Sequence, residues 1–305
     1  MKCSLCSSEA IYRAEYNQNS YCRDHFSEMI ERRFKREIRR QMHLGRRKTT
    51  VTVALSGGKD SSVTLYLMKK TLGNRKNTTI KAITVDEGIS GYRSSGLESA
   101  RKLCDSLGVE HQVISFSDTY KTTMDSMVKK NPAKIPCSMC GPMRRDAMNT
   151  IAGMVDSDYL ALGLNLDDYA QTVLMNVARG DIDRMLRMAP HSNRITGLVP
   201  RILPLIRIPE KEVLTYAISN GIIFDSSWCP YYSQAQRNLF REIVVKLEHE
   251  NPGTRFAIAN FAESLKDQFS SRSQHNVMEI GKCSLCGKPS SSEICPVCQN
   301  LVELP

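Results

Sequence analysis

The chain lacks the features of a membrane, secreted or disordered protein. No apolar run approaches the ~20 residues that a helix needs to cross a bilayer, so we expect no membrane contact. The first residues, from Met1 to Cys6, contain no apolar signal core, and we therefore expect a cytoplasmic protein. Hydrophobic residues at 41% and charged residues at 24% exclude disordered and collagen-like compositions.

Acidic residues are the minority among the charged ones. The 305 residues include 42 Lys and Arg against 32 Asp and Glu, which gives a formal net charge of +10. A basic protein of this kind favours an anionic partner. At a typical size of about 150 residues per domain, the length predicts roughly two folding units.

The positive charge is concentrated between Glu31 and Lys48, where nine basic residues stand against two glutamates. Through this region an apolar residue recurs at every fourth position: Phe26, Ile30, Phe34, Ile38 and Met42. This spacing puts the apolar side chains on one face of a helix and leaves the arginines on the others. A solvated helix face is one explanation, but so one-sided a charge favours binding to an RNA phosphate backbone.

From Thr50 onward, strand patterns alternate with helix patterns. We expect strands at Val51–Leu55, Thr79–Val85, Val109–Phe116 and Tyr159–Gly163. We expect helices after Ser61 and at Leu97–Leu107, Thr119–Lys130, Met143–Met154, Asp167–Arg179, Lys211–Asn220, Gln234–His249 and Thr254–Phe269. Three prolines make Val199–Pro209 a constrained connection. The alternation predicts an α/β fold with a doubly wound parallel sheet.

The composition also suggests domain limits. We expect an N-terminal zinc finger at 1–26, a basic linker helix at 27–48 and the sheet domain at 49–209. A helical extension follows at 210–274, and a polar break, Ser270–Gln274, precedes a C-terminal zinc ribbon at 275–305.

Eight of the residues near the two ends have the spacing of zinc ligands. The N-terminal set is Cys3, Cys6, Cys22 and His25, and the C-terminal set is Cys283, Cys286, Cys295 and Cys298. In a reducing compartment such cysteines indicate metal binding rather than disulfides, and a two-residue gap lets two ligands converge on one tetrahedral ion. Four ligands leave no open position, so we expect two structural Zn²⁺ ions. A redox Cys-x-x-Cys would not explain two pairs at each end, although His25 alone is also compatible with an ordinary helix residue.

A glycine-containing hexapeptide lies between the first strand of the sheet and the following helix: Ser56, Gly57, Gly58, Lys59, Asp60 and Ser61. Glycines allow backbone N–H groups to approach phosphate oxygens, and a helix N-terminus favours an anion. The two serine hydroxyls add donors, Lys59 is placed to neutralise phosphate charge and Asp60 to hold Mg²⁺. An ordinary glycine turn is the alternative, but the strand–loop–helix context favours a nucleotide site.

Four cysteines lie outside the zinc sets. Cys137 and Cys140 form a pair, and Cys229 stands alone between Trp228 and Pro230. Three thiolates suit an iron–sulfur cluster with one open iron, but a third zinc ion or a persulfide-carrying pair fits the spacing too. Cys104 lies on an apolar helix face and is expected in the core.

The hexapeptide resembles the SGGxDS loop of the N-type ATP pyrophosphatases, or PP-loop enzymes. The resemblance implies cleavage of ATP between its α and β phosphates to adenylate an oxygen. It also implies that adenine binds beside the next strand, where Val85 and Asp86 are the candidates. The nucleotide-binding residues expected from this resemblance are Ala54, Leu55, Ser56, Gly57, Gly58, Lys59, Asp60, Ser61, Val85, Asp86, Gly163 and Asp168.

The order of motifs over essentially the whole chain resembles the TtuA-type tRNA 2-thiouridine synthetase family, including its cytoplasmic wobble-uridine branch. The motifs are the Cys-x-x-Cys and Cys-x-x-His module, the hexapeptide, the middle cysteine pair, Gly163–Asp168, the lone Cys229 and the four-cysteine module. The resemblance implies that Cys137, Cys140 and Cys229 hold a [4Fe-4S] cluster. Where the family often has Gly-His-Asn, this chain has Leu164, so any role of that histidine is absent.

The resemblance predicts ATP-dependent thiolation of tRNA. The uridine C2 oxygen would attack the α phosphate, and sulfur would then replace the adenylated oxygen by transfer through the cluster. We expect Asp60, Arg144 and Asp168 to be catalytic, with Arg144 stabilising charge on phosphorus and Asp168 orienting Mg²⁺ or acting on the uracil. Helix capping by Asp168 and a surface ion pair of Arg144 are the structural alternatives.

The implied partners are tRNA, a sulfur donor and a second copy of the chain in a homodimer. The donor would be a ubiquitin-like thiocarboxylate carrier, a persulfide or free sulfide. Three other functions share some of these motifs: 2-thiocytidine synthesis of the TtcA type, an amidating or thiamine-type synthetase, and a non-catalytic zinc-ribbon RNA-binding protein. Neither the position of the thiolated uridine, 34 or 54, nor the donor follows from the sequence.

Overall fold

A parallel sheet of five strands lies at the centre of the computed structural model, which describes residues 1–191, 195–272 and 281–302. Its strands are β3 Thr49–Ala54, β4 Thr78–Asp86, β5 Glu110–Ser115, β6 Tyr159–Leu162 and β7 Arg201–Ile202. They follow the order β5-β4-β3-β6-β7, and every neighbouring pair is parallel. The direction of winding therefore reverses between β3 and β6, and ligands of open α/β sheets bind at such a switch point.

Helices cover both faces of the sheet, as the residues of β4 illustrate. Ile80 and Ala82 pack in one apolar cluster with α2 (Lys59–Leu72) and α3 (Arg93–Leu107). Ile83 and Val85 point to the other face, against α6 (Pro136–Met154). The alternation has the period of two that a strand imposes. The predicted doubly wound sheet is confirmed.

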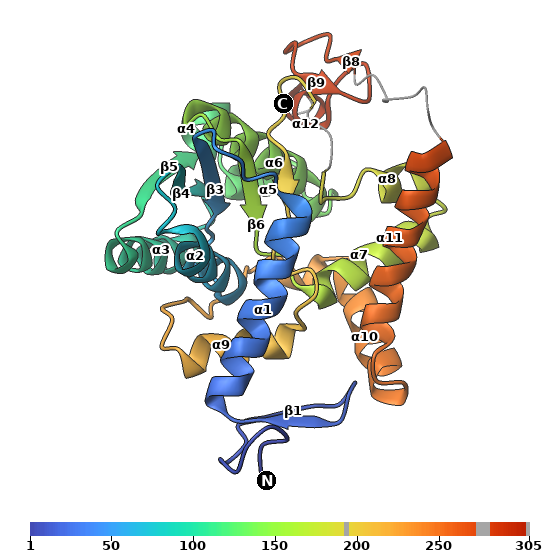
Figure 1. The fold of residues 1–305 in the computed structure, drawn as a ribbon. Coiled ribbons are helices and arrows are strands. Elements are labelled where there is room, and N and C mark those ends of the chain that lie inside the picture. Colours follow the sequence, from blue (N-terminus) through green and yellow to red (C-terminus); the bar gives the residue numbers. More distant parts are fainter. Residues whose placement is uncertain (192–194, 273–280, 303–305) are drawn as a thin grey trace.

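The remaining elements surround this sheet (Figure 1). They are β1 Tyr12–Ala14, β2 Asn19–Tyr21, α1 Arg23–Gln41, α4 Phe116–Tyr120, α5 Met124–Lys130, α7 Leu166–Ala178, α8 Ile182–Leu186, α9 Glu210–Ser219, η1 Tyr232–Gln234, α10 Arg237–Glu250, α11 Thr254–Arg272, β8 Gly281–Lys282, β9 Pro289–Ser290 and α12 Pro296–Val302. The two cysteine-rich modules lie at opposite ends of the molecule, and α7, α10 and α11 pack together beside the sheet.

Helix α1 confirms the predicted apolar stripe. Phe26, Ile30, Phe34, Ile38 and Met42 are all buried, with at most 3% of their surface exposed. Cys104 is also in the core, as expected. In the described part of the chain, no helix has both the length and the apolar character that a membrane span requires.

Three predictions of local structure were wrong. The helix expected at Thr119–Lys130 is two helices, because Lys121 has a left-handed φ of +57° that ends α4, and the hydroxyl of Thr123 caps α5. Helix α6 begins at Pro136 rather than Met143, since proline suits the first turn of a helix. The proline-rich connection contains a short strand, β7. The predicted domain limit at 274–275 lies outside the described residues.

Candidate nucleotide and metal sites

The N-terminal ligand set is arranged as a tetrahedral zinc site requires. Cys3, Cys6, Cys22 and His25 bring their ligand atoms within 4.8 Å of one another. The Cys6 and Cys22 sulfurs are 3.8 Å apart, which is about the edge of a tetrahedron with Zn–S bonds of about 2.3 Å. The Nδ1 atom of His25 lies 3.4 Å from the Cys3 sulfur and 3.3 Å from the Cys22 sulfur. His25, in the first turn of α1, is therefore oriented as a ligand.

The C-terminal ligand set has the same geometry. Cys283, Cys286, Cys295 and Cys298 also lie within 4.8 Å of one another, and the Cys286 and Cys295 sulfurs are 3.8 Å apart. The backbone N–H of Cys295 donates to the Cys283 sulfur at 3.2 Å, which favours the thiolate that a metal needs. Both predicted ligand sets therefore come together and fit zinc.

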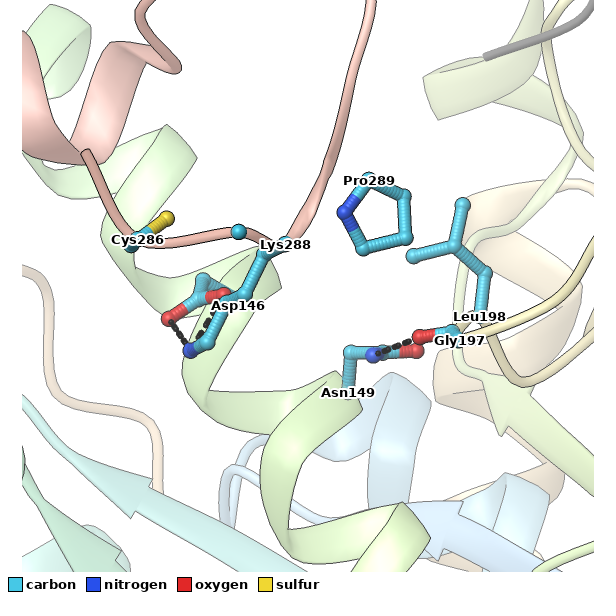
Figure 2. Close-up of a pocket in the computed structure, with 8 residues that line it drawn as sticks. Asp146, Asn149, Gly197, Leu198, Cys286, Lys288 and Pro289 are labelled. Atoms are coloured by element: carbon cyan, nitrogen blue, oxygen red, sulfur yellow. Dashed lines mark hydrogen bonds and ion pairs between the residues drawn. The ribbon is translucent and has the colours of Figure 1, made fainter. Parts of the chain in front are cut away.

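The C-terminal module packs on α6. The Lys288 ammonium lies 2.8 and 2.9 Å from the two carboxylate oxygens of Asp146, and Val297 and Leu301 of α12 contact the apolar cluster beneath. A cavity of about 370 Å³ lies beside this contact (Figure 2). None of its lining residues belongs to Ser56–Ser61, so it is separate from the nucleotide loop.

The predicted nucleotide loop has an ordered hydrogen-bond pattern between β3 and α2. The Ser61 hydroxyl lies 3.1 Å from the Ser56 hydroxyl, accepts from the Ser56 N–H at 3.1 Å and donates to the Gly58 carbonyl at 2.9 Å. Gly57 has φ +88°, and a Cβ there would lie 2.0 Å from the Gly96 carbonyl oxygen. Only glycine fits this position. The loop therefore presents its hydroxyls and the N-terminus of α2 in one place, as an anion site requires.

The loop after β6 meets this nucleotide loop at the switch point of the sheet. The Asn165 amide donates to the Asp60 carboxylate at 3.0 Å. A Cβ on Gly163 would lie 2.8 Å from the Asp60 backbone, so the two loops touch. Asn165 and Asp168 form a capping box at the start of α7. The structure thus brings Asp60 to Gly163 and Asp168, which follow it by more than 100 positions in sequence, and gives Asp168 the capping role as well.

A network of alternating charges surrounds Lys59. Its ammonium lies 2.8 Å from the Asp60 carboxylate and 2.9 Å from that of Glu210, at the start of α9. Arg241 of α10 donates two hydrogen bonds to Glu210, at 3.1 and 3.0 Å. Burial lowers the pKa of Lys59, but these two carboxylates more than offset it, and the pKa rises above its ordinary value. Lys59 therefore stays cationic beside the loop.

Asp168 is held in an environment that disfavours its charge. Burial, followed by the negative charge of Asp60, raises the pKa of Asp168 to about 6. Arg237 opposes this shift from 3.6 Å, and its guanidinium also donates to the Asp168 carbonyl and the Thr172 hydroxyl. A carboxyl group with a pKa near neutrality, beside a second carboxylate, is typical of functional sites.

Three of the cysteines outside the terminal sets, Cys137, Cys140 and Cys229, interact through their charges. Burial raises the pKa of Cys140 to about 11, and the charges of Cys137 and Cys229 add to this increase. Cys140 and Cys229 both pack against the apolar cluster around Met139 and Met143. In the described chain the three sulfurs are not among the groups within 4.8 Å of one another. They therefore do not form a compact ligand set for a single ion, while a donor set of three thiolates is the kind that holds an iron–sulfur cluster.

A series of ion pairs and one hydrogen bond connects the region of these cysteines to the nucleotide loop. Arg93 donates to the Ser56 carbonyl at 2.9 Å and forms an ion pair with buried Glu87 at 3.1 Å. Glu87 lies 3.6 Å from Arg144, and the charges of Cys140 and Glu87 raise the pKa of Arg144 above its ordinary value. Arg144 therefore lies between the cysteines and the nucleotide loop, and it is half exposed.

Comparison with known proteins identifies the family. A model of the PP-loop domain matches residues 27–248, and a model of the N-terminal LIM domain of the 2-thiouridine synthetase TtuA matches residues 2–27. The chain belongs to the TtuA- and NcsA-type PP-loop family.

Relatives of this family match the chain over nearly its full length. The tRNA 2-thiolation protein NcsA of Haloferax volcanii is 32% identical over 98% of each chain. The tRNA-5-methyluridine(54) 2-sulfurtransferase of Pyrococcus horikoshii is 32% identical over 98% of this chain and 93% of its own. The structure of the U34-tRNA thiolase NcsA from Methanococcus maripaludis, solved with its [4Fe-4S] cluster, has a TM-score of 0.84 at 34% identity, covering 100% of this chain and 96% of that one.

Other residues that were predicted to contact the nucleotide in this PP-loop protein have packing or hydrogen-bond partners within the fold. The Leu55 side chain is in the core, its N–H bonds to Ile83 and its carbonyl accepts from Thr84. Val85 packs against the cluster on α6, and Asp86 accepts from the N–H of Gly88. Ala54 lies half-buried at the end of β3.

Several site residues escaped the sequence analysis. Glu87, Arg93, Glu210 and Arg241 have no motif of their own, because their partners are distant in sequence. Asn165 was detectable, since Asn followed three residues later by an acidic residue is the pattern of a helix cap.

Proposed function

We propose that this chain is an ATP-dependent tRNA 2-thiouridine synthetase. The uridine C2 oxygen attacks the α phosphorus of ATP, and pyrophosphate leaves. Sulfur at the oxidation level of sulfide then forms a bond to C2, and AMP leaves with the oxygen. The proposal rests above all on the link from the nucleotide loop to the three cysteines through Arg93, Glu87 and Arg144, since both halves of the reaction must meet at one base.

The nucleotide loop would bind and orient the phosphates of ATP. The serine hydroxyls and the backbone N–H groups at the start of α2 supply hydrogen bonds to phosphate oxygens. Lys59 would exchange a carboxylate partner for phosphate and so neutralise charge on the leaving pyrophosphate. Arg144 would stabilise negative charge that develops at the α phosphorus.

The carboxylates at the switch point fit Mg²⁺, which prefers oxygen ligands. Asp60 would hold the ion, and the neighbouring negative charges of Asp168 and Glu210 would favour it. The ion would neutralise phosphate charge. Asp168 would orient the reacting groups from its position at the start of α7.

The two ligand sets at the ends fit Zn²⁺, and Cys137, Cys140 and Cys229 fit a [4Fe-4S] cluster. Such a cluster would supply an open iron to which a sulfur atom binds. The three thiolates would position it beside Arg144. The cluster in the Methanococcus maripaludis thiolase supports this assignment.

The substrate tRNA would contact the exposed basic face of α1, and the uridine is at position 34 or 54. Relatives named for each position match this chain at similar identity. The homodimer and the sulfur donor stay predictions from the family resemblance.

The test combines metal analysis with product analysis. Wild type purified without oxygen should contain iron, sulfide and zinc, and should convert tRNA uridine to 2-thiouridine with release of AMP. Cys140→Ala should bind ATP normally yet contain no cluster and thiolate no tRNA. Cys104→Ala, which removes a core thiol, should retain iron and activity. Normal thiolation by Cys140→Ala would overturn the cluster mechanism, and 2-thiocytidine in the product would identify the TtcA-type reaction instead.

A further inference from the structure

The single tryptophan of the chain, Trp228, lies on the surface. It is 63% exposed, although tryptophan is a residue that folding usually buries to a large extent. It directly precedes Cys229 in sequence. An exposed aromatic ring at this position, beside a proposed active site, is a surface on which a nucleic-acid base can stack.

The Trp228 ring is held by its neighbours. The Tyr232 ring packs against it edge to face, with centroids 4.8 Å apart, and the Arg241 guanidinium lies 5.7 Å from its centroid. Arg241 is itself fixed by Glu210 and by a hydrogen bond to the Tyr232 hydroxyl at 3.1 Å. These two neighbours restrict the exposed ring, so that little conformational entropy is lost when a ligand stacks on it.

The segment that carries Trp228 runs between the two halves of the proposed site. The Asp225 N–H donates to the Gly57 carbonyl of the nucleotide loop at 2.8 Å, and the Ser227 hydroxyl donates to Asp225 at 2.9 Å. Cys229, one residue after Trp228, packs against the same apolar cluster as Cys140. A base that reacts first with ATP and then with sulfur must lie in this same interval.

We propose that Trp228 stacks on a nucleobase of the substrate RNA and holds the reacting uridine region at the site. This inference rests on the proposed function. Enzymes that modify a base must unstack it, and an aromatic side chain replaces the lost stacking with little dependence on sequence. The adenine of ATP has the same stacking chemistry, so the experiment distinguishes the two sources.

The sole tryptophan makes intrinsic fluorescence a direct probe of this ring. We expect tRNA to quench the fluorescence of the wild-type protein, with the same midpoint that an electrophoretic shift gives for tRNA binding. ATP alone should leave the fluorescence nearly unchanged. Quenching by ATP with no further change on adding tRNA would assign the ring to adenine and overturn the proposal.

Variants give the second readout. Trp228→Ala should weaken tRNA binding by about tenfold, within the range of one aromatic–base stack, whereas Trp228→Phe should retain most of it. Phe261→Ala, which removes a 56% exposed ring from α11, is the matched control and should bind as wild type does. Iron analysis of Trp228→Ala checks that the neighbouring Cys229 still functions.

Two failures are distinguishable. If tRNA binds wild type and Trp228→Ala equally well, or binds without changing the fluorescence, the stacking proposal is wrong while the proposed function stands. If no tRNA binds to the wild-type protein that contains its metals, the proposed function fails and the stacking proposal fails with it.

Discussion

Two adjacent aspartates at the start of α7 have opposite energetic roles. Asp167 is buried and forms an ion pair with Arg255 at 2.7 Å, and it also accepts from the N–H of Glu210. Asp168 instead faces the carboxylate of Asp60, and its pKa is raised to about 6. The charge of Asp167 therefore stabilises the folded protein, whereas the charge of its neighbour Asp168 destabilises it.

We predict that Asp168→Asn stabilises the nucleotide-free protein above pH 6. The ordinary pKa of 3.8 lies below the folded value of about 6, so the folded state holds an extra proton between these values. The wild type therefore gains stability as pH falls from 6 towards 4, and above pH 6 it carries the full cost of the charge. The gain from Asp168→Asn should be about 1–2 kcal/mol at pH 8 and shrink towards pH 4.

Melting temperatures of both proteins at pH 8 and pH 5 measure this difference. Asp167→Asn is the matched control, and it should lower the melting temperature at both values because Arg255 loses a buried partner. An Asp168→Asn protein that is less stable than wild type at pH 8 would contradict the prediction.

The two glycines of the nucleotide loop should differ in their tolerance of a methyl group. Gly57→Ala puts a Cβ against the Gly96 carbonyl at a left-handed φ, and should cost about 2 kcal/mol or more and abolish ATP binding. Gly58 has φ −75°, and its Cβ would meet only the Ser56 hydroxyl, at 3.5 Å. Gly58→Ala should therefore fold as wild type does. Thermal melting and nucleotide binding of the two variants test this, and equal stability would refute it.

Site residues whose partners are close in the sequence could be predicted from their spacing. Site residues whose partners are distant in the sequence could not. The Cys-x-x-Cys and Cys-x-x-His pairs indicate the two ligand sets that come together in the structure, since each pair is close in the chain itself. Glu210 acts on Lys59 from 151 positions away, and only the parallel sheet brings α9 to the loop. Arg93 and Glu87 likewise depend on the turn after β4, which no motif marks.

At the scale of elements, some arginines of α1 form ion pairs within the fold, and others lie exposed on its surface. Arg33 forms an ion pair with Glu212, and Arg40 with Glu37 and Glu263. Arg32, Arg36 and Arg39 are exposed. Some arginines of the basic segment therefore stabilise the fold. The composition alone does not distinguish these ion-paired arginines from the exposed ones.

We predict that the exposed arginines carry the RNA contacts of α1. The triple change of Arg32, Arg36 and Arg39 to Gln should weaken tRNA binding most at low salt. It should reduce the slope of log affinity against log salt by up to about three, roughly one for each lost phosphate contact. A control triple at the exposed positions Lys76, Arg101 and Lys129 removes the same charge from elsewhere. Equal slopes for the two triples would show that α1 does not contact RNA.

Strand and helix patterns predicted the elements well where one face is buried. The stripe of α1 and the alternation in β4 each match a buried face. The predictions failed at Lys121–Thr123, where polar residues end one helix and start another, and at Pro136, where proline begins a helix rather than preceding one. At the first place the side-chain cap of Thr123 outweighed the apolar period, and at the second the fixed φ of proline suits a helix start.

At the scale of the whole molecule, the two cysteine-rich modules contact different parts of the fold. The N-terminal module packs through Tyr16, which donates to Glu212 at 2.5 Å and stacks edge to face on Phe256. The C-terminal module packs on α6, the helix that carries Cys137 and Cys140. Each module thus supports a different half of the proposed reaction.

We predict that losing one zinc ion affects one half of the reaction before the other. Cys286→Ser should reduce zinc from two ions to one per chain, loosen α6 and lower iron content, while ATP binding persists. Cys6→Ser should also remove one zinc ion, but should leave the iron content unchanged. Elemental analysis and ATP titration measure these effects. Equal loss of iron in both variants would contradict the separation.

Helix α9 gives the N-terminal module an influence beyond its own surface. Glu210 contacts Lys59 of the nucleotide loop. Glu212, two residues later, is fully buried, and its partners are Tyr16 and Arg33. A truncation that removes the first 20 residues would deprive this carboxylate of a hydrogen bond and uncover Phe256. Trimming the protein to its sheet domain would therefore disturb the very helix that holds the ATP loop, and a shortened chain is a poor substitute for the intact one in any assay of nucleotide binding.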